Sequence, residues 1–490
     1  MDLSGHILAV DIGSSSVRCS LYHEAGGLVE GTGATRKHAF TTTRDGGATL
    51  DADELCDLVF ETLDETYAHI ETHSIAGVAV STLWHSVLGV DGRGRPTMPI
   101  FSWADRRAAD AAGELRERLD GTEVHRRTGC VLHSSYLPAK LLWLSRSFPE
   151  AFSRTEVWIS PGEYLHSRLF NEAYVGTSMA AGTGLLDQNS KTWDESILAA
   201  LPIEADQLSP ISDEPSRGLR AEWARRWPAL ADVPWFPAVG DGACSNIGSG
   251  CTGSGRLALM VGTSGAMRIL WKADSVRVPE GLWCYRSDAK RFVAGGALSD
   301  GGNLVGWLRE TLRLPKPEET EEILATMEPD AHGLTFLPLL AGERGPGWAD
   351  TANGTVAGLS MTTSPAEILR AAMEAVALRF ALIAERLDAA FPEGASSREV
   401  IATGGGLSRS PTWTGILADA LGRPMTASAV PEASSRGAAL LALEALGGPG
   451  IEEAAVPLGE TYEPDLSRHT IYREALKRQR ELYDAVMRKA

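Results

Sequence analysis

Two short turns of similar composition lie about half a chain length apart and constrain the fold more than any other feature. Asp11–Ser15 follows the apolar run 7–10, and Val261–Gly265 begins at the last residue of the apolar run 257–261. Each turn leads into a second strand-like run, so each copy is predicted to be a hairpin. Glycine and hydroxyl residues in a tight turn place N–H and O–H donors together, which suits phosphate oxygens. The repetition predicts two related domains that face each other.

The length of the chain supports this division. Its 490 residues exceed what one hydrophobic core usually supports. We expect two domains of the α/β class, over residues 1–248 and 249–490, with a ligand cleft where they meet. A buried helix over residues 365–391 is predicted from an apolar stripe at helical spacing, which comprises Leu369, Met373, Val376, Phe380, Ile383 and Leu387.

Composition excludes several classes of partner. The net charge is −18 without a basic stripe, which argues against nucleic acid or an anionic membrane surface. No apolar run reaches the roughly 20 residues of a membrane span, and no basic segment followed by an apolar stretch opens the chain. Six scattered cysteines without a C-x-x-C pair predict free thiols in a reducing cytoplasm.

Two carboxylates stand where phosphoryl transfer from a nucleotide needs them. Asp11 ends a predicted strand inside the first turn and could anchor Mg²⁺, although an Asp there could also cap the turn through its own side chain. Asp241 stands between two glycines at a predicted helix start. It could accept a proton from a sugar hydroxyl, or it could serve as the helix N-cap.

Glycine-rich segments offer further places for close ligand approach. Gly404–Gly406 lies between a predicted strand and a helix, where it would admit an adenine ring or ribose. The same run is compatible with a strained strand–helix connection. No G-x-G-x-x-G opens a βαβ unit, so a dinucleotide-binding fold is not indicated.

A longer pattern carries a family resemblance. Gly354-x-Val356-x-Gly358-Leu359 is followed, after seven residues, by Glu367-Ile368-x-x-Ala371-Ala372-Met373-Glu374. Together with the two turns and Gly240–Gly242, this pattern resembles the FGGY carbohydrate kinases, within the sugar kinase/heat-shock/actin superfamily. The resemblance spans roughly residues 5–445. It implies two ribonuclease-H-like (actin-like ATPase) domains facing a central cleft, with ATP and Mg²⁺ as cofactors.

The resemblance also implies roles for individual positions. Asp241 corresponds to the catalytic base, and Mg²⁺ is expected at Asp11 and Asp241. The ATP contacts are expected at Gly13, Ser14, Ser15, Thr263, Ser264, Gly302, Gly405 and Gly406. The sugar contacts are expected at Trp84, His85, Trp103, Asp105, Arg106, Tyr136 and Lys140.

Short segments around the expected sugar pocket look most like gluconokinase-type members. A sugar acid needs a cation for its carboxylate, and Arg106, Lys140 and His85 are the residues considered for it. Structural ion pairs on helix faces are the alternative for Arg106 and Lys140. Xylulose or another ketopentose or polyol is the second choice of substrate, and homodimer formation is left open.

Two other classes remain as rivals. A nucleotide switch like actin or a heat-shock ATPase would hydrolyse ATP without sugar dependence. A sugar-responsive regulator of the superfamily would carry a DNA-binding module, and no basic helix-turn-helix segment precedes Ile7.

Overall fold

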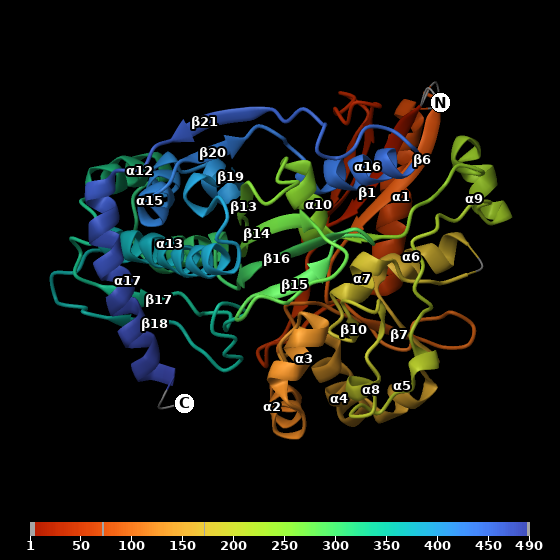
Figure 1. Cartoon of the computed structure of the whole chain (residues 1–490), viewed down its shortest axis with the longest axis horizontal. Coiled ribbons are helices and arrows are strands. Elements are labelled where there is room, and N and C mark those ends of the chain that lie inside the picture. The colour runs from red at the N-terminus through yellow and green to blue at the C-terminus, as the bar shows by residue number, and fades with distance from the viewer. Residues whose placement is uncertain (1–4, 71–72, 171, 488–490) are drawn as a thin grey trace.

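Two mixed sheets form the frame of the molecule. The computed structural model describes residues 5–70, 73–170 and 172–487. In Figure 1 the early strands β1 and β6 stand on one side, and α13, α15 and α17 stand on the other. The second-half strands β13 to β16 (green) lie between these two groups.

The first sheet has the order β12-β6-β1-β2-β3. Strands β1 and β2 form the predicted hairpin around Gly13–Ser15, and β6 and β12 continue the sheet in parallel. The bounds are β1 His6–Ile12, β2 Ser16–Tyr22, β3 Ala34–Lys37, β6 Ile75–Thr82 and β12 Val239–Gly240.

The second sheet repeats this pattern and extends it. Its order is β15-β16-β14-β13-β19-β20-β21, with an antiparallel β13–β14 hairpin and parallel β19 and β20. The run β16-β14-β13-β19-β20 therefore matches β3-β2-β1-β6-β12 strand for strand, as the paired turns predict. The bounds are β13 Arg256–Val261, β14 Gly265–Lys272, β15 Trp283–Arg286, β16 Arg291–Leu298, β19 Glu399–Thr403, β20 Met425–Ser428 and β21 Leu458–Tyr462.

Helices cover both sheets. The larger ones are α1 Ala52–Ile70, α2 Ala109–Arg118, α3 Gly121–Thr128, α4 Leu137–Ser147, α6 Pro161–Leu169, α10 Asp241–Gly248, α11 Gly302–Thr311, α12 Pro317–Thr326, α13 Pro365–Ala390, α15 Pro411–Leu421, α16 Ala433–Ala445 and α17 Leu466–Met487. The shorter ones are α5 Pro149–Arg154, α7 Thr177–Ala181, α8 Glu195–Leu198, α9 Ala221–Arg226 and α14 Gly405–Ser408. Small sheets are formed by β4 Thr41–Thr42, β5 Ala48–Leu50, β7 Leu88–Val90, β8 Ile100–Phe101, β9 Val157–Ile159, β10 Leu186–Asp187, β11 Thr192–Trp193, β17 Thr335–Leu337 and β18 Thr355–Ala357.

Helix α13 is the central element of the second half, and its start and its buried face both follow from the sequence. Ser364 and Glu367 form a reciprocal capping box, which satisfies backbone N–H groups that a helix start leaves unpaired. The six residues of the predicted apolar stripe are all buried in the largest core cluster. The predicted helix is confirmed.

Helices α10 and α16 bring the two halves of the chain together. Although α16 comes late in the sequence, it packs on β1 and β6 of the first sheet (Figure 1). Two glycines allow its backbone to approach α10: a Cβ on Gly437 would lie 1.9 Å from the carbonyl oxygen of Cys244, and one on Gly248 would lie 1.8 Å from that of Ala433. The contact therefore admits no side chain at either glycine.

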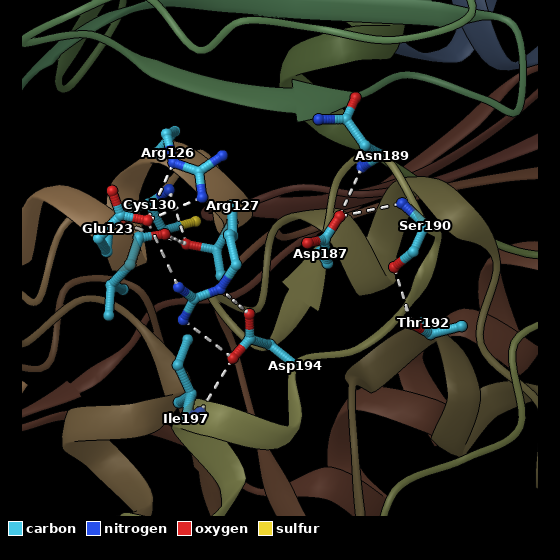
Figure 2. A network of polar contacts seen from close by, with 12 residues as sticks. Glu123, Arg126, Arg127, Cys130, Asp187, Asn189, Ser190, Thr192, Asp194 and Ile197 are labelled. Carbon is cyan, nitrogen blue, oxygen red and sulfur yellow. Dashed lines mark hydrogen bonds and ion pairs between the residues drawn. The ribbon is translucent and has the colours of Figure 1, made fainter.

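A polar network attaches α3 and the β10–β11 hairpin to one another and to the second half. Figure 2 shows the Arg127 guanidinium bound to the Asp194 carboxylate and the Asp187 carboxylate accepting from two N–H groups of its own turn. From that turn, the Asn189 amide exchanges two hydrogen bonds with the backbone of Val276 in the second half. Arg286 donates to the Gln188 carbonyl at 2.6 Å. The halves are thus joined outside the cleft as well.

The structure bears on two expectations about the chain, the state of its cysteines and the presence of a membrane span. All six cysteines lie among the described residues as buried free thiols, as predicted. Among the described helices, none is both long and apolar enough to cross a membrane.

The glycine contact between α10 and α16 yields a stability test. Gly437→Ala would force a methyl group into the Cys244 backbone, and overpacking of this kind costs about 1–3 kcal/mol of unfolding free energy. Gly415→Ala in α15 is the matched control, because no atom outside the neighbouring turns of its own helix lies within 4 Å of its Cβ position; this change should stabilise by about 0.5–1 kcal/mol. Urea unfolding of both variants measures the difference, and equal stability would contradict the packing described.

Candidate functional site

Two adjoining cavities occupy the junction of the two halves. The inner cavity, of about 130 Å³, is lined by Trp84, His85, Tyr136, Asp241, Arg268, Trp283, Tyr285, Arg344 and Trp348 among others. The outer cavity, of about 480 Å³, is lined by both hairpin turns through Ser14, Ser15, Thr263 and Ser264. Ser14, Trp103, Ser264 and Arg344 line both. The two turns therefore face each other across one cleft.

The two candidate metal-binding carboxylates lie near this cleft, where Asp11 is buried and Asp241 is half-buried. Asp11 is the penultimate residue of β1; its Oδ2 accepts from Arg18 at 3.2 Å, and Oδ1 makes no hydrogen bond of ordinary geometry to the described residues. Burial raises the pKa of Asp11 to about 6, although the Ser81 hydroxyl and the Arg18 charge oppose the rise; the Asp241 charge adds a smaller contribution in the same direction as burial. A buried carboxylate oxygen that lacks a donor suits a hard divalent cation such as Mg²⁺.

Asp241 begins α10 and lines the inner cavity. Its Oδ1 accepts from the Gly242 N–H at 2.8 Å. Burial raises the pKa of Asp241, and the Arg268 charge opposes that rise. The helix N-cap is Gly240 rather than Asp241, so the capping alternative does not describe this residue.

The position of Trp84 explains why the residues on either side of Asp241 are glycines. A Cβ on Gly240 would lie 1.9 Å from the indole of Trp84, and one on Gly242 would lie 2.7 Å from it. The space beside both glycines is therefore filled by this indole. Its Nε1–H donates to the Ser178 carbonyl at 3.0 Å, which fixes the ring against the backbone that carries Asp241.

His85 stands beside Trp84 as a neutral ring. Its φ of 60° lies in the left-handed region, and Nδ1 lies 2.5 Å from the Gly182 carbonyl. Burial lowers the pKa of His85 to about 3. With Nδ1–H donating to Gly182, Nε2 is left as an acceptor, so His85 suits a hydroxyl rather than a carboxylate.

The aromatic wall of the inner cavity comes from both halves. Tyr136 and Tyr285 hydrogen-bond to each other at 2.5 Å, and Trp283 stacks on Tyr285 with ring centroids 4.5 Å apart. Trp103 lies at the boundary of the two cavities and donates to Ser14 Oγ at 3.2 Å. Aromatic faces of this kind pack against the C–H surface of a sugar.

Three of the expected sugar-binding residues lie away from the inner cavity. Lys140 is buried and donates to the carbonyls of His85 and Ser135, both at 2.7 Å; burial lowers its pKa to about 7. Asp105 is buried and accepts from Ala48 and Arg107. Arg106 lines the outer cavity, where it donates to the Asp350 carbonyl at 2.8 Å. Lys140 thus holds two backbone segments of the inner-cavity wall, whereas the partners of Asp105 line neither cavity.

Two arginines that the sequence analysis missed line the inner cavity instead. Arg268 and Arg344 have no ion-pair partner among the described residues, and burial lowers the pKa of both, that of Arg344 to about 10. The Arg344 guanidinium lies 4.3 Å from the ring centroid of Trp103. An arginine inside the apolar run 266–271 was a usable signal for Arg268, since an isolated charge is rarely buried there without function. Arg344 does not stand in an apolar run, so no comparable sequence pattern pointed to it.

Arg344 belongs to a loop of the second half that docks on the first half. The Asp350 carboxylate of this loop accepts from Ser134 Oγ at 2.5 Å and from Arg116 at 3.2 Å, and His133 Nε2 lies 3.0 Å away. Burial alone would raise the pKa of Asp350, but these bonds lower it overall. The loop also carries Trp348, so its docking completes the inner cavity.

The glycines expected at the adenosine are packed against the second turn. Gly302 donates to the Gly262 carbonyl at 2.8 Å. Cβ atoms on Gly404 and Gly406 would lie 2.4 and 2.8 Å from the Val261 carbonyl oxygen. Gly405 is exposed beside them. Close backbone packing accounts for Gly302, Gly404 and Gly406, and their contact with a nucleotide stays a prediction.

Family models match almost the whole described chain. The model of the N-terminal domain of the FGGY family of carbohydrate kinases matches residues 6–248, and that of its C-terminal domain matches residues 257–446. The chain belongs to the FGGY family of carbohydrate kinases. Its resemblance to that family is therefore confirmed, and it is a sugar kinase of this family.

Individual relatives agree on the fold and differ in sugar. A gluconokinase from Bacillus subtilis (strain 168) is 28% identical over 498 residues, covering 98% of this chain and 94% of that protein. The crystal structure of gluconate kinase from Lactobacillus acidophilus superposes with a TM-score of 0.89 at 27% identity, covering 98% of both chains. The ligand-bound xylulose kinase from the same organism has a TM-score of 0.87 at 26% identity, again covering 98% of both. The predicted two-domain actin-like fold is confirmed.

The docked loop predicts how this FGGY kinase binds its carbohydrate. Asp350→Ala removes hydrogen bonds to a charged group, each worth about 1.5–3 kcal/mol, so the loop should undock and KM for the sugar should rise at least about tenfold. Asp484→Asn on the exposed face of α17 removes the same charge and should leave KM unchanged. Steady-state kinetics measure both, and an unaltered KM in Asp350→Ala would show that docking does not support binding.

Proposed function

We propose that this FGGY kinase transfers the γ-phosphate of ATP to the primary hydroxyl of D-gluconate, giving 6-phosphogluconate, in the cytoplasm. The observation that carries the choice of sugar is the charge of the inner cavity. Its lining holds Arg268 and Arg344 against the single carboxylate of Asp241, and His85 is neutral. An excess of guanidinium in the lining favours a substrate with a carboxylate, which arginine binds in a bidentate manner.

The two turns suit the phosphates of ATP. Gly13, Ser14 and Ser15 on one side and Thr263 and Ser264 on the other would supply N–H and O–H donors, with the adenosine toward Gly302, Gly405 and Gly406. A Mg²⁺ held at Asp11, and reached by Asp241, would neutralise charge on the phosphates.

Asp241 is placed to act as general base. In the proposed step its carboxylate takes the proton of the primary hydroxyl while that oxygen attacks the γ-phosphorus and ADP leaves. The docked Asp350 loop excludes water, which would otherwise accept the phosphoryl group. Lys140 holds the wall against which the sugar would lie.

The base assignment predicts a loss of turnover without a loss of binding. Asp241→Asn keeps the shape of the side chain but cannot accept the proton, and general base catalysis contributes about 10²–10⁴-fold. We expect kcat to fall by about that factor while ATP affinity, measured by calorimetry, changes little. Near-wild-type turnover in this variant would remove Asp241 from the role.

The carboxylate assignment predicts a change in discrimination between two matched sugars. Glucitol differs from gluconate in having a hydroxymethyl group in place of the carboxylate. Arg344→Gln should lower kcat/KM for gluconate by about 10–100-fold, as expected for one charged hydrogen bond, and should lower that for glucitol much less. Arg344→Lys should recover part of the gluconate activity. Equal losses on both sugars would mean that Arg344 does not bind the carboxylate.

An ADP-release assay with gluconate, xylulose, ribulose, glycerol and erythritol tests the proposal as a whole. The highest kcat/KM is expected on gluconate. A higher kcat/KM for xylulose or another uncharged ketose would contradict the gluconate proposal. It would favour the alternative, a ketopentose kinase, to which a similar solved structure belongs. ATP hydrolysis independent of every sugar would instead favour a nucleotide switch.

A further inference from the structure

The Asp350 loop, residues 343–350, is held within the second half by a buried carboxylate, in addition to its docking on the first half. The Glu343 side chain is fully buried. Its Oε1 accepts from the Gly347 N–H at 3.1 Å, and its Oε2 accepts from the Ala349 N–H at 3.4 Å. The Glu343 N–H in turn donates to the Ala349 carbonyl at 3.2 Å. One carboxylate therefore closes the loop on itself.

The two N–H groups bound by Glu343 lie on either side of Trp348, whose backbone conformation needs support. Trp348 has a φ of 61°, in the left-handed region that residues with a side chain rarely adopt. Such a conformation persists only where the surrounding structure over-determines it. The Trp348 ring lines the inner cavity, and its centroid lies 5.6 Å from that of His133 and 6.1 Å from that of Tyr136. Loss of the bonds to Glu343 would therefore release this ring from the cavity wall.

Two helices of the second half hold the Glu343 carboxylate. Arg379 of α13 forms an ion pair with it, and Tyr483 of α17 donates its hydroxyl to Oε2 at 2.5 Å. The Arg379 guanidinium also lies 5.1 Å from the centroid of the Tyr483 ring. A Cβ on Gly347 would lie 2.0 Å from the Tyr483 hydroxyl oxygen, so the loop backbone packs directly on α17. The carboxylate is thus fixed by bonds between ionised groups, which are stronger than those between neutral ones.

A second arginine of α13 holds the same loop and an adjoining part of the cavity wall. Arg386 comes seven residues after Arg379, so the two lie on one face of the helix. It donates to the Pro346 carbonyl at 2.5 Å and to the Gly281 carbonyl at 3.0 Å. Gly281 is two residues before Trp283, which begins β15 and lines the inner cavity. One face of α13 therefore supports both the loop and the start of β15.

We propose that Glu343 is a positioning residue for sugar binding, and that Arg379 and Tyr483 act on the sugar through it. The carboxylate holds Trp348 in its left-handed conformation and keeps the adjacent Arg344 in the inner cavity. No described residue of α17 lines the inner or the outer cavity, yet α17 contributes to the affinity for sugar through this carboxylate. The inference rests on the proposed binding of the sugar in the inner cavity, and it applies to any sugar bound there.

Tyr483→Phe and Tyr472→Phe form a matched pair of variants on α17. Each removes one hydroxyl that donates to a buried glutamate paired with an arginine of α13, since Tyr472 donates to Glu374 at 3.0 Å and Glu374 pairs with Arg370 at 2.6 Å. Neither Tyr472 nor Glu374 lines the inner or the outer cavity. The two changes therefore remove the same kind of bond and differ in whether that bond supports the Asp350 loop.

Steady-state kinetics on whichever carbohydrate is turned over fastest separates the pair. Tyr483→Phe should raise KM for the sugar about threefold or more, as expected for one lost hydrogen bond, and should change kcat by less than about twofold. Tyr472→Phe should lower the unfolding midpoint as Tyr483→Phe does but leave KM unchanged. A KM that is unchanged in Tyr483→Phe, or raised equally in both variants, overturns the positioning role.

Glu343→Gln tests the carboxylate itself and has a readout that needs no substrate. The amide keeps the shape of the side chain but loses its charge and one acceptor oxygen. KM for the sugar should rise about tenfold or more, and hydrogen exchange in residues 344–350 should accelerate about tenfold, because bonds to a charged group are lost. Tyr472→Phe should exchange there as the wild type does. Wild-type exchange in both Glu343→Gln and Tyr483→Phe overturns the proposal; Tyr483→Phe leaves every charge in place and decides the matter if Glu343→Gln does not fold.

Trp348→Ala separates this inference from the proposed sugar site. A raised KM in Trp348→Ala, with an unchanged KM in Glu343→Gln and Tyr483→Phe, overturns the positioning role and leaves the sugar site intact. An unchanged KM in both Trp348→Ala and Arg344→Gln overturns the sugar site and this inference with it. A preference for a sugar other than gluconate alters neither result, because KM is measured on the sugar that the enzyme turns over fastest.

Discussion

The packing of one indole against one stretch of backbone is the constraint on which the rest of the site depends. Trp84 lies so close to Gly240 and Gly242 that neither position can carry a side chain, and the carboxylate between them is fixed by that contact. Ser178 holds both partners, the indole through its carbonyl and the Gly240 N–H through its hydroxyl. Because protein interiors are close-packed, a shift of the ring would move the proposed base.

The charged side chains around Trp84 fall into two groups with separate roles. Asp105, Lys140 and Asp350 are buried and hydrogen-bonded within the chain, so they hold segments in place. Arg268 is buried and Arg344 is half-buried; neither has an ion-pair partner in the described part of the chain, and both line the inner cavity, where a ligand could pair with them. The distinction rests on which groups have their partners inside the protein, which only the folded arrangement shows.

The parts of the fold that the sequence predicted are encoded by residues close together in the chain. The two turn hairpins and the apolar stripe of α13 follow from neighbouring residues, and the repeated turn predicted two related domains. Sequence also located Trp84, Trp103, Tyr136 and Asp241, which the structure brings to one cavity. It missed Arg344 because this residue reaches the cavity only when the Asp350 loop docks on residues more than two hundred positions earlier. Long-range contacts of this kind leave no periodic signal.

Both halves of the chain contribute residues to the lining of the inner cavity. Trp84, His85 and Tyr136 come from the first half, whereas Arg268, Tyr285 and Arg344 come from the second. If the inner cavity binds the sugar as proposed, a chimaera that joins the first half of one relative to the second half of another lines it with a new combination of aromatic and guanidinium groups. Recombination at the boundary between the halves then becomes a route to altered specificity.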